Sequence, residues 1–283
     1  MIDFSDCPRT NNMYSGSERK IGVIFNDAEY MLKFQTRNEL GALFNHVSEH
    51  IGSSVFNALG IEAQETMLGT YDGSEVVACR VFGSDTEQFV PFNDVGESSL
   101  DSIGKTQYSY TDIMRLLRAD RKLVEVDDMI DRFWNMYIVD ALLGNFDRHG
   151  ANWGFIKSNN RYHHAPVFDN GSCLYPRMND ETLMMRVIES EEQTDERVYR
   201  YPSSQVRIGN SRSTYYDVIH SLRFEDCNDA LRRMYEVMDM DRIYDIVNRT
   251  PFITDVHKKF YIHMLRSRYE KIIECSYREL RDA

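Results

Sequence analysis

The sequence predicts an α+β protein with two lobes, in which a small lobe of antiparallel strands precedes a larger helical lobe. Short runs of alternating apolar and polar residues, separated by turn residues, occur up to about residue 88 and are typical of antiparallel strands. From Tyr110 onward, apolar residues recur mainly at helical spacing. We therefore predict an N-lobe of residues 1–88 and a C-lobe of residues 89–283 within one domain.

The composition excludes several classes of protein. A chain of 283 residues, 42% of them hydrophobic and 28% charged, is expected to be soluble and globular. The net charge of −12 argues against direct binding of nucleic acid or of an anionic membrane. The five cysteines have no CxxC spacing and are expected to be reduced thiols rather than zinc ligands. No signal peptide or bilayer-spanning run is visible, so we predict a cytoplasmic protein, with export as an effector left open.

The first predicted element of the N-lobe is a β-hairpin that follows a turn of small residues. The run IGVIF, a turn at Asn26 and Asp27, and the run EYMLKF have the alternation and turn chemistry of paired strands. Just before them, Ser15, Gly16 and Ser17 form a turn whose backbone N–H groups could lie against phosphate oxygens. A turn with a single glycine is equally compatible with an ordinary hairpin, so both interpretations stay open here.

Lys33 and Glu49 are two charged residues that the pattern places among apolar neighbours. Lys33 lies between two core-type residues of the second strand, so its side chain points to the opposite face of the sheet. Glu49 lies within a helix predicted over residues 38–59, which ends at Gly60. Lys33 is either a solubilising lysine or a ligand of nucleotide phosphates, and Glu49 either faces solvent or pairs with Lys33.

The rest of the chain passes from strands to helices. Strands are predicted over residues 62–70 and 75–82, and a loop-rich hinge over residues 83–106. The C-lobe is predicted to be helical over residues 111–117 and 127–143, helical and acidic over 180–192, and irregular over 194–213. Further helices are predicted over residues 215–222, 227–237, 240–249 and 254–280.

Three polar residues, Asp147, Asn152 and Asp169, flank another predicted β-hairpin. Its strands are expected over residues 153–157 and 161–168, with turn residues between them. Because antiparallel strands of similar length return the chain to its starting point, we expect Asn152 and Asp169 side by side, with Asp147 one loop away. A base, an amide oxygen and a carboxylate at one edge are the groups that phosphoryl transfer from a magnesium–nucleotide complex requires.

The motif NFDRHGAN at residues 145–152, followed by FDNG at residues 168–171, resembles the catalytic core of HipA-like serine/threonine kinases. The run YSGSERKIGVIFNDAEYMLKF resembles the phosphate-loop hairpin of that family, and SSVFNALGIEAQETMLGTYDGSEVVACRVF resembles its following helix and hinge strands. The run APVFDNGSCLYP resembles the metal-binding segment of compact members, notably the cell-translocating kinase A group. The resemblance spans roughly residues 13–175 and implies a two-lobed protein-kinase-like fold.

The resemblance also implies a role for each matching residue. Asp147 would be the catalytic base, and His149 would brace its loop. Asn152 and Asp169 would hold Mg²⁺. The residues implied to contact ATP are Lys33 with its partner Glu49, the backbone at Cys79 and Val81, and the phosphate loop of Ser15, Gly16 and Ser17, in which Ser15 or Ser17 would be autophosphorylated.

The same resemblance implies a protein substrate that presents a serine or threonine, with ATP and Mg²⁺ as cofactors. Full-length HipA toxins carry a further N-terminal subdomain, whereas this chain starts almost directly at the phosphate loop. An antitoxin-type partner is therefore not assumed. A role as a toxin, a delivered effector or a bacterial regulator is left open.

Other interpretations compete with a protein kinase. A lipid kinase would need basic residues after the D-x-G motif, but residues 180–200 carry seven acidic residues against three arginines. A metallohydrolase that uses His149, His163, His164 and Asp169 is disfavoured. His163 and His164 are adjacent in a predicted strand and point to opposite faces, so they cannot both bind one ion without a bulge. A chance polar loop would have to reproduce the motif, the hairpin and D-x-G together. A catalytically silent nucleotide-binding module is the alternative from another class.

Overall fold

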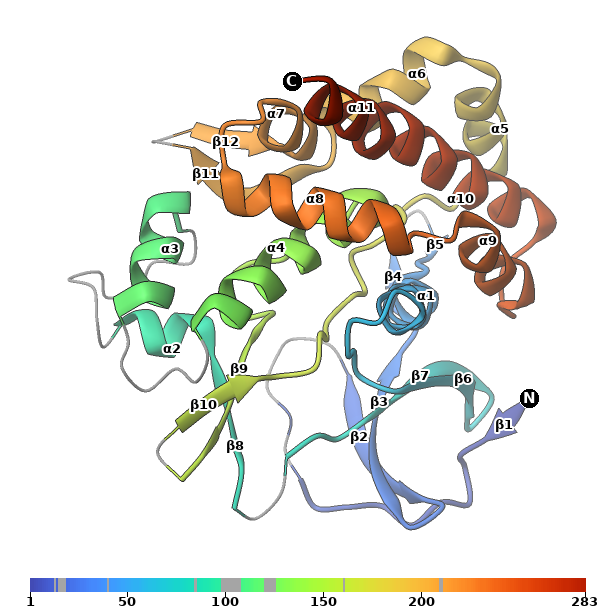
Figure 1. The fold of residues 1–283 in the computed structure, drawn as a ribbon. Helices are drawn as coiled ribbons and strands as arrows, with labels where there is room; N and C mark the ends of the chain where they lie inside the picture. Colours follow the sequence, from blue (N-terminus) through green and yellow to red (C-terminus); the bar gives the residue numbers. More distant parts are fainter. Residues whose placement is uncertain are drawn as a thin grey trace.

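A β-rich lobe and a helical lobe lie on either side of a cleft, which confirms the predicted α+β, two-lobed fold (Figure 1). The computed structural model describes residues 1–12, 14, 19–39, 41–83, 86–97, 108–119, 126–159, 161–208 and 211–283. The N-lobe sheet is at the lower right of Figure 1, and most helices are at the top. A boundary between residues 88 and 89 stays a prediction.

The N-lobe is built on a five-stranded sheet with the strand order β1-β6-β7-β3-β2. Both predicted hairpins are present, because β2 pairs with β3 and β6 pairs with β7, each antiparallel. Asn26 and Asp27, between β2 and β3, have φ of 49° and 61°, as in a type I′ hairpin turn. The strands are β1 (Ile2–Asp3), β2 (Lys20–Phe25), β3 (Ala28–Phe34), β6 (Thr66–Tyr71) and β7 (Ser74–Arg80).

The two faces of β3 have different neighbours. Leu32 and Phe34 point into a small core on one face of the sheet, where Leu32 is fully buried. Lys33, between them, points to the other face, toward the cleft and helix α1 (Asn45–Ala58). The predicted alternation is confirmed, and it places a buried lysine at the cleft.

Helix α1 is shorter than the sequence predicts. A helix is predicted over residues 38–59, whereas α1 begins at Asn45. The preceding residues form the short strands β4 (Arg37–Asn38) and β5 (Gly41–Ala42). Gly41 has φ of +127°, which a helix does not allow. In addition, Asn45 Oδ1 accepts hydrogen bonds from the backbone N–H and the hydroxyl of Thr36 at 3.1 and 2.8 Å, which ties the start of the helix to the preceding segment. The end is as predicted, with Gly60 at φ +77° just after the helix.

The segment predicted to be a loop-rich hinge contains two regular elements. Strand β8 (Gln88–Pro91) and helix α2 (Phe92–Glu97) lie within residues 83–106, so the prediction is wrong for this part. The rest of the prediction at residues 84–85 and 98–106 lies outside the described residues. Strand β8 has only four residues and is surrounded by turn-type residues, so the local composition predicts a loop there.

Strand β8 belongs to a second sheet, together with the hairpin that the sequence predicts beside the motif. The hairpin strands are β9 (Gly154–Ser158) and β10 (Arg161–His164), and β8 pairs with the other side of β9. Phe92, directly after β8, stacks on Trp153 with a ring-centroid distance of 4.1 Å. This long-range contact stabilises β8 and α2 in a segment whose local composition favours a loop.

The C-lobe is packed around α4 (Val126–Leu143), whose Trp134, Ile138 and Leu142 side chains are fully buried. Both α8 and α10 contact α4, and the helix predicted over residues 254–280 is one continuous helical path. Its parts are α10 (Asp255–Arg268), η2 (Tyr269–Glu274) and α11 (Cys275–Asp282). The other helices predicted here are α3 (Tyr110–Ala119), α7 (Tyr215–His220), α8 (Glu225–Val237) and α9 (Met240–Arg249).

Two predictions for the C-lobe are wrong. The acidic segment predicted as one helix over residues 180–192 is two helices, because Ser190 is extended and its hydroxyl caps the second helix by accepting a hydrogen bond from Gln193 N. Residues 194–213, predicted to be irregular, contain the π-helix η1 and an antiparallel hairpin. The elements are α5 (Glu181–Glu189), α6 (Glu191–Asp195), η1 (Glu196–Arg200), β11 (Ser203–Ile208) and β12 (Ser211–Thr214).

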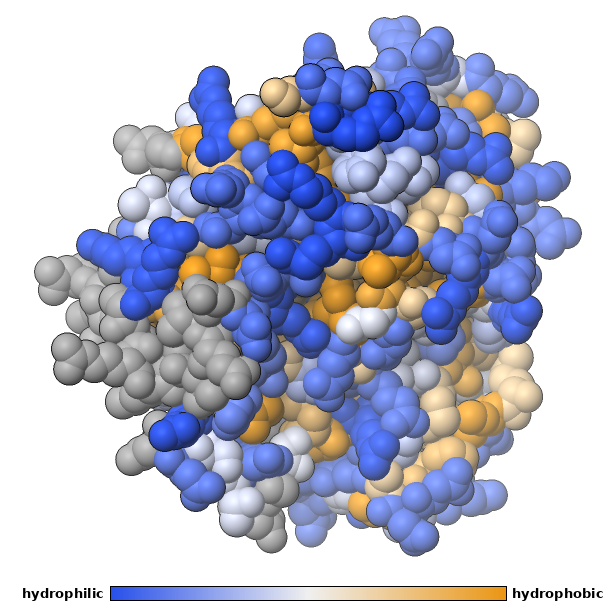
Figure 2. All heavy atoms as spheres, in the orientation of Figure 1, coloured by the Kyte–Doolittle hydropathy of each residue, from blue (hydrophilic) through white to orange (hydrophobic). Residues whose placement is uncertain are grey.

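One face of the molecule is mainly polar (Figure 2). Figure 2 shows one face, on which hydrophilic residues predominate and hydrophobic residues lie in small groups. Tyr201 is one of the few large hydrophobic side chains that are exposed in the described part of the chain. Within the same part, no helix combines the length and the apolar character needed to cross a membrane.

Candidate active site

The cleft between the lobes contains most of the residues that the motif predicts, and its volume is about 390 Å³. Lys33 on β3 and Glu49 on α1 line it from the N-lobe. Asp147, Asn152 and Asp169 line it from the C-lobe. The structure therefore brings together residues that are far apart in the sequence, and it does so across the two lobes.

Lys33 connects the two groups through two ion pairs. Its Nζ lies 2.9 Å from Glu49 Oε2 and 3.1 Å from Asp169 Oδ1. Burial by itself lowers the pKa of Lys33, but the two carboxylates more than offset this effect and raise the pKa well above its ordinary value. Lys33 in turn lowers the pKa of Asp169, so both groups are charged at neutral pH. The pairing of Glu49 with Lys33, which the sequence leaves open, is present.

Asp147 lies on the loop after α4, and its side chain is 44% exposed at the cleft. Its backbone N–H donates to Asn145 Oδ1 at 3.0 Å, which holds the loop. His149 Nε2 lies 3.9 Å from Asp147 Oδ1, and His149 Nδ1 accepts a hydrogen bond from Ala151 N at 3.2 Å. Burial raises the pKa of Asp147, against a smaller lowering effect of His149. A raised pKa is the direction expected of a carboxylate that accepts a proton.

Asn152 and Asp169 are suited to hold a magnesium ion. Asn152 Nδ2 donates to the backbone oxygen of Asp147 at 2.9 Å, which leaves the amide oxygen as the ligand-type atom. Asp169 has φ of 56°, a left-handed conformation that is uncommon for residues other than glycine, and its side chain lines the cleft. Amide and carboxylate oxygens are the ligands that Mg²⁺ prefers, so the donor set fits this ion.

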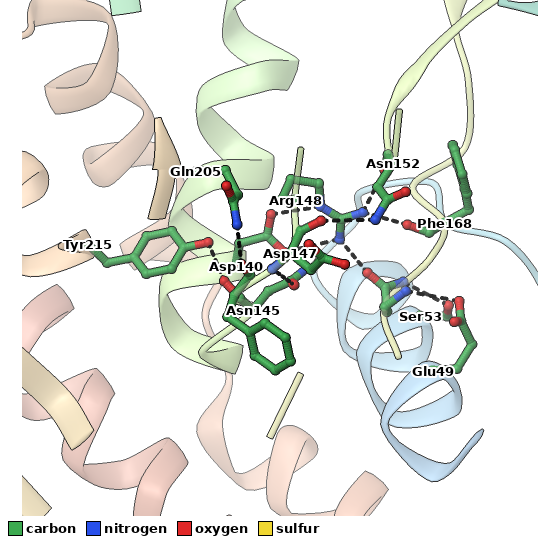
Figure 3. A network of polar contacts seen from close by, with 12 residues as sticks. Glu49, Ser53, Asp140, Asn145, Asp147, Arg148, Asn152, Phe168, Gln205 and Tyr215 are labelled. Atoms are coloured by element: carbon green, nitrogen blue, oxygen red, sulfur yellow. Dashed lines mark hydrogen bonds and ion pairs between the residues drawn. The ribbon is translucent and has the colours of Figure 1, made fainter. Parts of the chain in front are cut away.

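Arg148 is a buried residue that organises the site, a role that the sequence does not predict (Figure 3). Its guanidinium donates to both carboxylate oxygens of Asp140, at 2.9 and 3.1 Å. It also donates to the backbone oxygens of Asn152 and Phe168 and to the side-chain oxygen of Asn170. Arg148 therefore fastens the loop of the catalytic motif to the segment around Asp169. The arginine of the D-R-H motif was the only signal in the sequence for this role.

Asn170 extends the network to α1. Its backbone N–H donates to Glu49 Oε1 and its Nδ2 donates to Ser53 Oγ, both at 3.0 Å. Gly52 permits this approach, because a Cβ at that position would lie 2.6 Å from Asn170 Cβ. Figure 3 shows Glu49 and Ser53 on the same side of α1, facing the network. Glu49 thus holds Lys33 with one oxygen and the backbone of Asn170, next to Asp169, with the other.

The C-lobe holds the catalytic loop from the opposite side (Figure 3). Tyr215 Oη donates to the backbone oxygen of Asn145 at 2.7 Å, and Gln205 Nε2 donates to the backbone oxygen of Phe146 at 2.6 Å. Asn145 Nδ2 donates to Asp140 Oδ1 at 2.9 Å. The loop before Asp147 is therefore bonded to α7, β11 and α4, which limits its freedom to move.

Other residues that the sequence singles out are not among those lining this cleft. Cys79 is fully buried in the sheet, where its backbone pairs with β3 and β6. Val81 N already donates to the backbone oxygen of Glu29 at 2.9 Å, so this N–H is not free for an adenine. The adenine contact near Cys79 and Val81 stays a prediction. Ser15, Gly16 and Ser17 lie outside the described residues.

Two further cations line the cleft without a signal in the sequence, Lys20 on β2 and Arg177 in the segment after Asp169. Lys20 is the register partner of Lys33 in the β2–β3 pair, and its charge contributes to the lowered pKa of Asp169, after the larger effect of Lys33. In the sequence, Lys20 follows a polar run and Arg177 stands between a proline and a methionine, and neither position is one to which a motif assigns a ligand. Local pattern therefore carried no signal for them.

One further group of ligand-type side chains lies in the described part of the chain, away from the cleft. Ligand atoms of His220, Cys275 and Glu279 lie within 4.8 Å of one another. His220 Nδ1 lies 3.6 Å from Glu279 Oε2, and its ring stacks on Tyr216 with a centroid distance of 4.5 Å. An ion pair between α7 and α11 and a ring contact within α7 account for this grouping.

The fold and the cleft are those of the protein-kinase-like class. This class has two lobes, a lysine–glutamate pair between β3 and α1, and a loop aspartate beside two residues of the kind that bind metal ions. Within that class, the chain belongs to the family of the HipA-like C-terminal domain, whose family model matches residues 13–239. The family inferred from the motif is therefore confirmed.

Similar proteins agree with this assignment. The chain is 35% identical to the serine/threonine-protein kinase CtkA of Helicobacter pylori strain J99, over 98% of this chain and 87% of the relative. The crystal structure of a proinflammatory kinase CtkA from Helicobacter pylori matches with a TM-score of 0.93 and 34% identity, over 99% of this chain and 98% of that chain. A chain of the Shewanella oneidensis MR-1 complex of HipA, HipB and operator DNA matches with a TM-score of 0.53 at 15% identity, over 98% of this chain and 68% of that chain, which shows a likeness of fold alone.

Proposed function

We propose that this protein is a serine/threonine protein kinase that uses ATP and Mg²⁺. The observation that carries the proposal is one cleft in which a charged lysine of the N-lobe meets a base and two metal-type ligands of the C-lobe. Phosphoryl transfer depends on positioning and charge neutralisation, which these groups supply. The identity of 35% to a relative named as a serine/threonine kinase, over nearly the whole chain, supports the same activity here.

Five residues of the cleft take part in the proposed reaction. Lys33, held by Glu49, binds phosphate oxygens of ATP. Asn152 and Asp169 would hold Mg²⁺, which would neutralise phosphate charge. Asp147 accepts the proton of the substrate hydroxyl, while the hydroxyl oxygen bonds to the γ-phosphorus and the bond from that phosphorus to the ADP oxygen breaks.

We place the adenine end of the nucleotide near three aromatic rings between the lobes. Phe82, Phe89 and Phe168 pack with ring-centroid distances of 5.0 to 5.7 Å, and all three are half-buried. Half-buried apolar rings are typical of the walls that bind a purine. Phe82 directly follows Val81, so these rings adjoin the segment that the sequence predicts to meet the adenine.

The proposed acceptors are a protein substrate and a serine of the phosphate loop, Ser15 or Ser17. The family resemblance is the support for autophosphorylation, and mass spectrometry of Ser15→Ala and Ser17→Ala after reaction with ATP would identify the serine. All five cysteines are unpaired, which supports a reducing compartment such as the cytoplasm as the place of action. An antitoxin partner is not part of the proposal.

A lipid kinase is the alternative enzyme, and the charge of the C-lobe disfavours it. Helices α5 and α6, which follow the metal-binding segment, carry the carboxylates of Glu181, Glu189, Glu191, Glu192 and Asp195. Their negative potential repels an anionic phosphoinositide headgroup and is compatible with a neutral or basic protein segment.

Transfer of label from γ-labelled ATP tests the proposal. With Mg²⁺, the wild-type protein should label itself or a generic protein substrate. Asp147→Asn and Asp169→Asn should each lower the rate by about 10²-fold or more. The matched control is Asp245→Asn on α9, whose side chain is 60% exposed and far from the motif in sequence, and it should label at the wild-type rate.

The outcomes separate the alternatives. A wild-type rate in Asp169→Asn would contradict the metal assignment. Label found only in phosphoinositides would make the protein a lipid kinase. Binding of Mg-ATP without transfer to any acceptor would favour the nucleotide-binding module.

A further inference from the structure

Arg177, Phe146 and Tyr201 form a cluster beside the proposed base. Phe146 precedes Asp147 in the chain, and both line the cleft together with Arg177. The Arg177 guanidinium lies 5.7 Å from the centroid of the Phe146 ring, and the Tyr201 ring stacks on the same ring at 6.3 Å with an interplanar angle of 25°. Tyr201 is 49% exposed, so the cluster continues from the cleft to the surface.

The charge of Arg177 is not committed to another side chain. Among the described residues, its guanidinium forms no ion pair and no hydrogen bond, and it packs against the ring of Phe146. Arg148, in contrast, uses its guanidinium entirely within the buried network. Arg177 is exposed and lines the cleft together with Asp147. Its charge lowers the pKa of Asp147, but by less than His149 and Arg148 do.

The backbone before Arg177 is strained and firmly held. Leu174 and Tyr175 have φ of 54° and 56°, a left-handed conformation that is costly for residues with large side chains. Leu174 N donates to the backbone oxygen of Leu143 at 2.9 Å, and Tyr175 Oη donates to the backbone oxygen of Arg197 at 2.8 Å. Strain that is over-determined in this way is typical of functional sites, and here it directs the chain so that Arg177 reaches the cleft.

Arg177 also lies on the acceptor side of the cleft rather than the nucleotide side. The lysines that line the cleft, Lys20 and Lys33, both come from the N-lobe sheet. Arg177 comes from the C-lobe segment after Asp169 and contacts the residue next to the base. Arg177 and Phe146 therefore line the cleft beside the carboxylate that would receive a substrate hydroxyl.

We propose that Arg177 selects protein substrates in which a carboxylate side chain lies next to the acceptor serine or threonine. This inference rests on the proposed kinase function and names its substrate class. A guanidinium offers paired N–H donors that match a carboxylate, and the rings of Phe146 and Tyr201 provide an apolar surface for the flanking residues. The preference for a carboxylate applies only next to the acceptor residue. Further along the substrate, the acidic helices α5 and α6 favour basic or neutral residues instead.

Peptide kinetics test this proposal. The probes are peptides with one central serine in a neutral background, with a single Glu, Gln or Lys at each position from four before to four after the serine. The enzymes are the wild type, Arg177→Gln, Arg177→Glu and the matched control Arg200→Gln. Arg200 lies on η1 and is absent from the lining of the cleft. Thermal unfolding of each variant shows whether it is folded.

The wild-type enzyme and the Arg200→Gln variant should prefer a Glu peptide over the matching Gln peptide by about tenfold in kcat/KM, as expected of a charge-assisted contact. This preference should occur at one peptide position, or at two adjacent positions, relative to the central serine. Arg177→Gln should reduce this ratio to about twofold or less, and Arg177→Glu should favour Lys, with the KM for ATP unchanged. An equal rate for Glu and Gln peptides in the wild type would overturn the inference while leaving the kinase function intact. A rise in the KM for ATP in Arg177→Gln with the Glu preference unchanged would assign Arg177 to the nucleotide and overturn it as well. Absence of any transfer by the wild type would overturn the proposed function itself.

Discussion

Replacement of Arg148 by methionine should both destabilise the protein and abolish transfer. Its guanidinium makes five hydrogen bonds, two of them to Asp140, whose side chain is 1% exposed. Without Arg148, the Asp140 carboxylate is buried and uncompensated, which typically costs about 3–5 kcal/mol. This is a large share of a total stability of about 5–15 kcal/mol. Arg148→Lys keeps the charge but loses the fork of donors, so it should give an intermediate loss.

A double-mutant cycle separates the charge from the hydrogen bonds. In the Arg148→Met background, Asp140→Asn removes the unpaired charge and should restore about 2 kcal/mol of the loss. The double variant should still transfer phosphate at least about 10²-fold more slowly, because the backbone oxygens of Asn152 and Phe168 have lost the donor that positions them. Stability and activity should therefore respond differently to the second substitution.

Urea unfolding followed by tryptophan fluorescence measures these free energies, since Trp134 and Trp153 are both buried in the C-lobe. The matched control is Arg249→Met, because Arg249 is 82% exposed and its surface ion pair should contribute within about 0.5 kcal/mol. A loss below about 1 kcal/mol for Arg148→Met would refute the reasoning. So would a further loss, instead of recovery, when Asp140→Asn is added.

Three further predictions concern the same site. As the proposed base, Asp147 must be ionised to act, and burial raises its pKa. The value of kcat/KM should therefore fall with decreasing pH at a midpoint above the ordinary pKa of 3.8, as a pH–rate profile would show. Gly52→Ala should lower stability by about 1–3 kcal/mol in urea unfolding, because the added Cβ collides with Asn170 and separates α1 from the metal-binding segment. Lys33→Met should leave the buried Glu49 carboxylate without its ion-pair partner and so lower stability by about 3 kcal/mol. It should also weaken Mg-ATP binding in calorimetry, and unchanged binding would contradict the proposed contact of Lys33 with phosphate.

Local sequence patterns predicted the parts of the fold that depend on local physics. The alternation in β2 and β3 predicted which way Lys33 points, and the turn at Asn26 and Asp27 predicted the hairpin. Apolar spacing predicted α4 closely. The predictions failed where distant contacts decided the structure, as in β8, which is stabilised by pairing with β9, and in the strands before Asn45.

The candidate site shows the same division. The D-R-H and D-x-G motifs predicted Asp147, Asn152 and Asp169 as candidates, because the chemistry of metal and proton transfer restricts the residue types that can serve, and all three line one cleft. Lys20 and Arg177 carried no such signal, since a lysine or arginine in a polar stretch is usually a solvated residue. Their place in the cleft depends on strand register and on a strained backbone at Leu174 and Tyr175.

The sequence by itself determined the family, the α+β class and the groups available for chemistry, because motif residues and periodicity are properties of the chain. Only the tertiary structure decided how those groups combine. Glu49 pairs with Lys33 and holds Asn170, and Arg148 joins Asp140 to the metal-binding segment, through bonds between residues far apart in the chain. Such pairings are selected by burial, since a charge removed from water must find its partner within the fold.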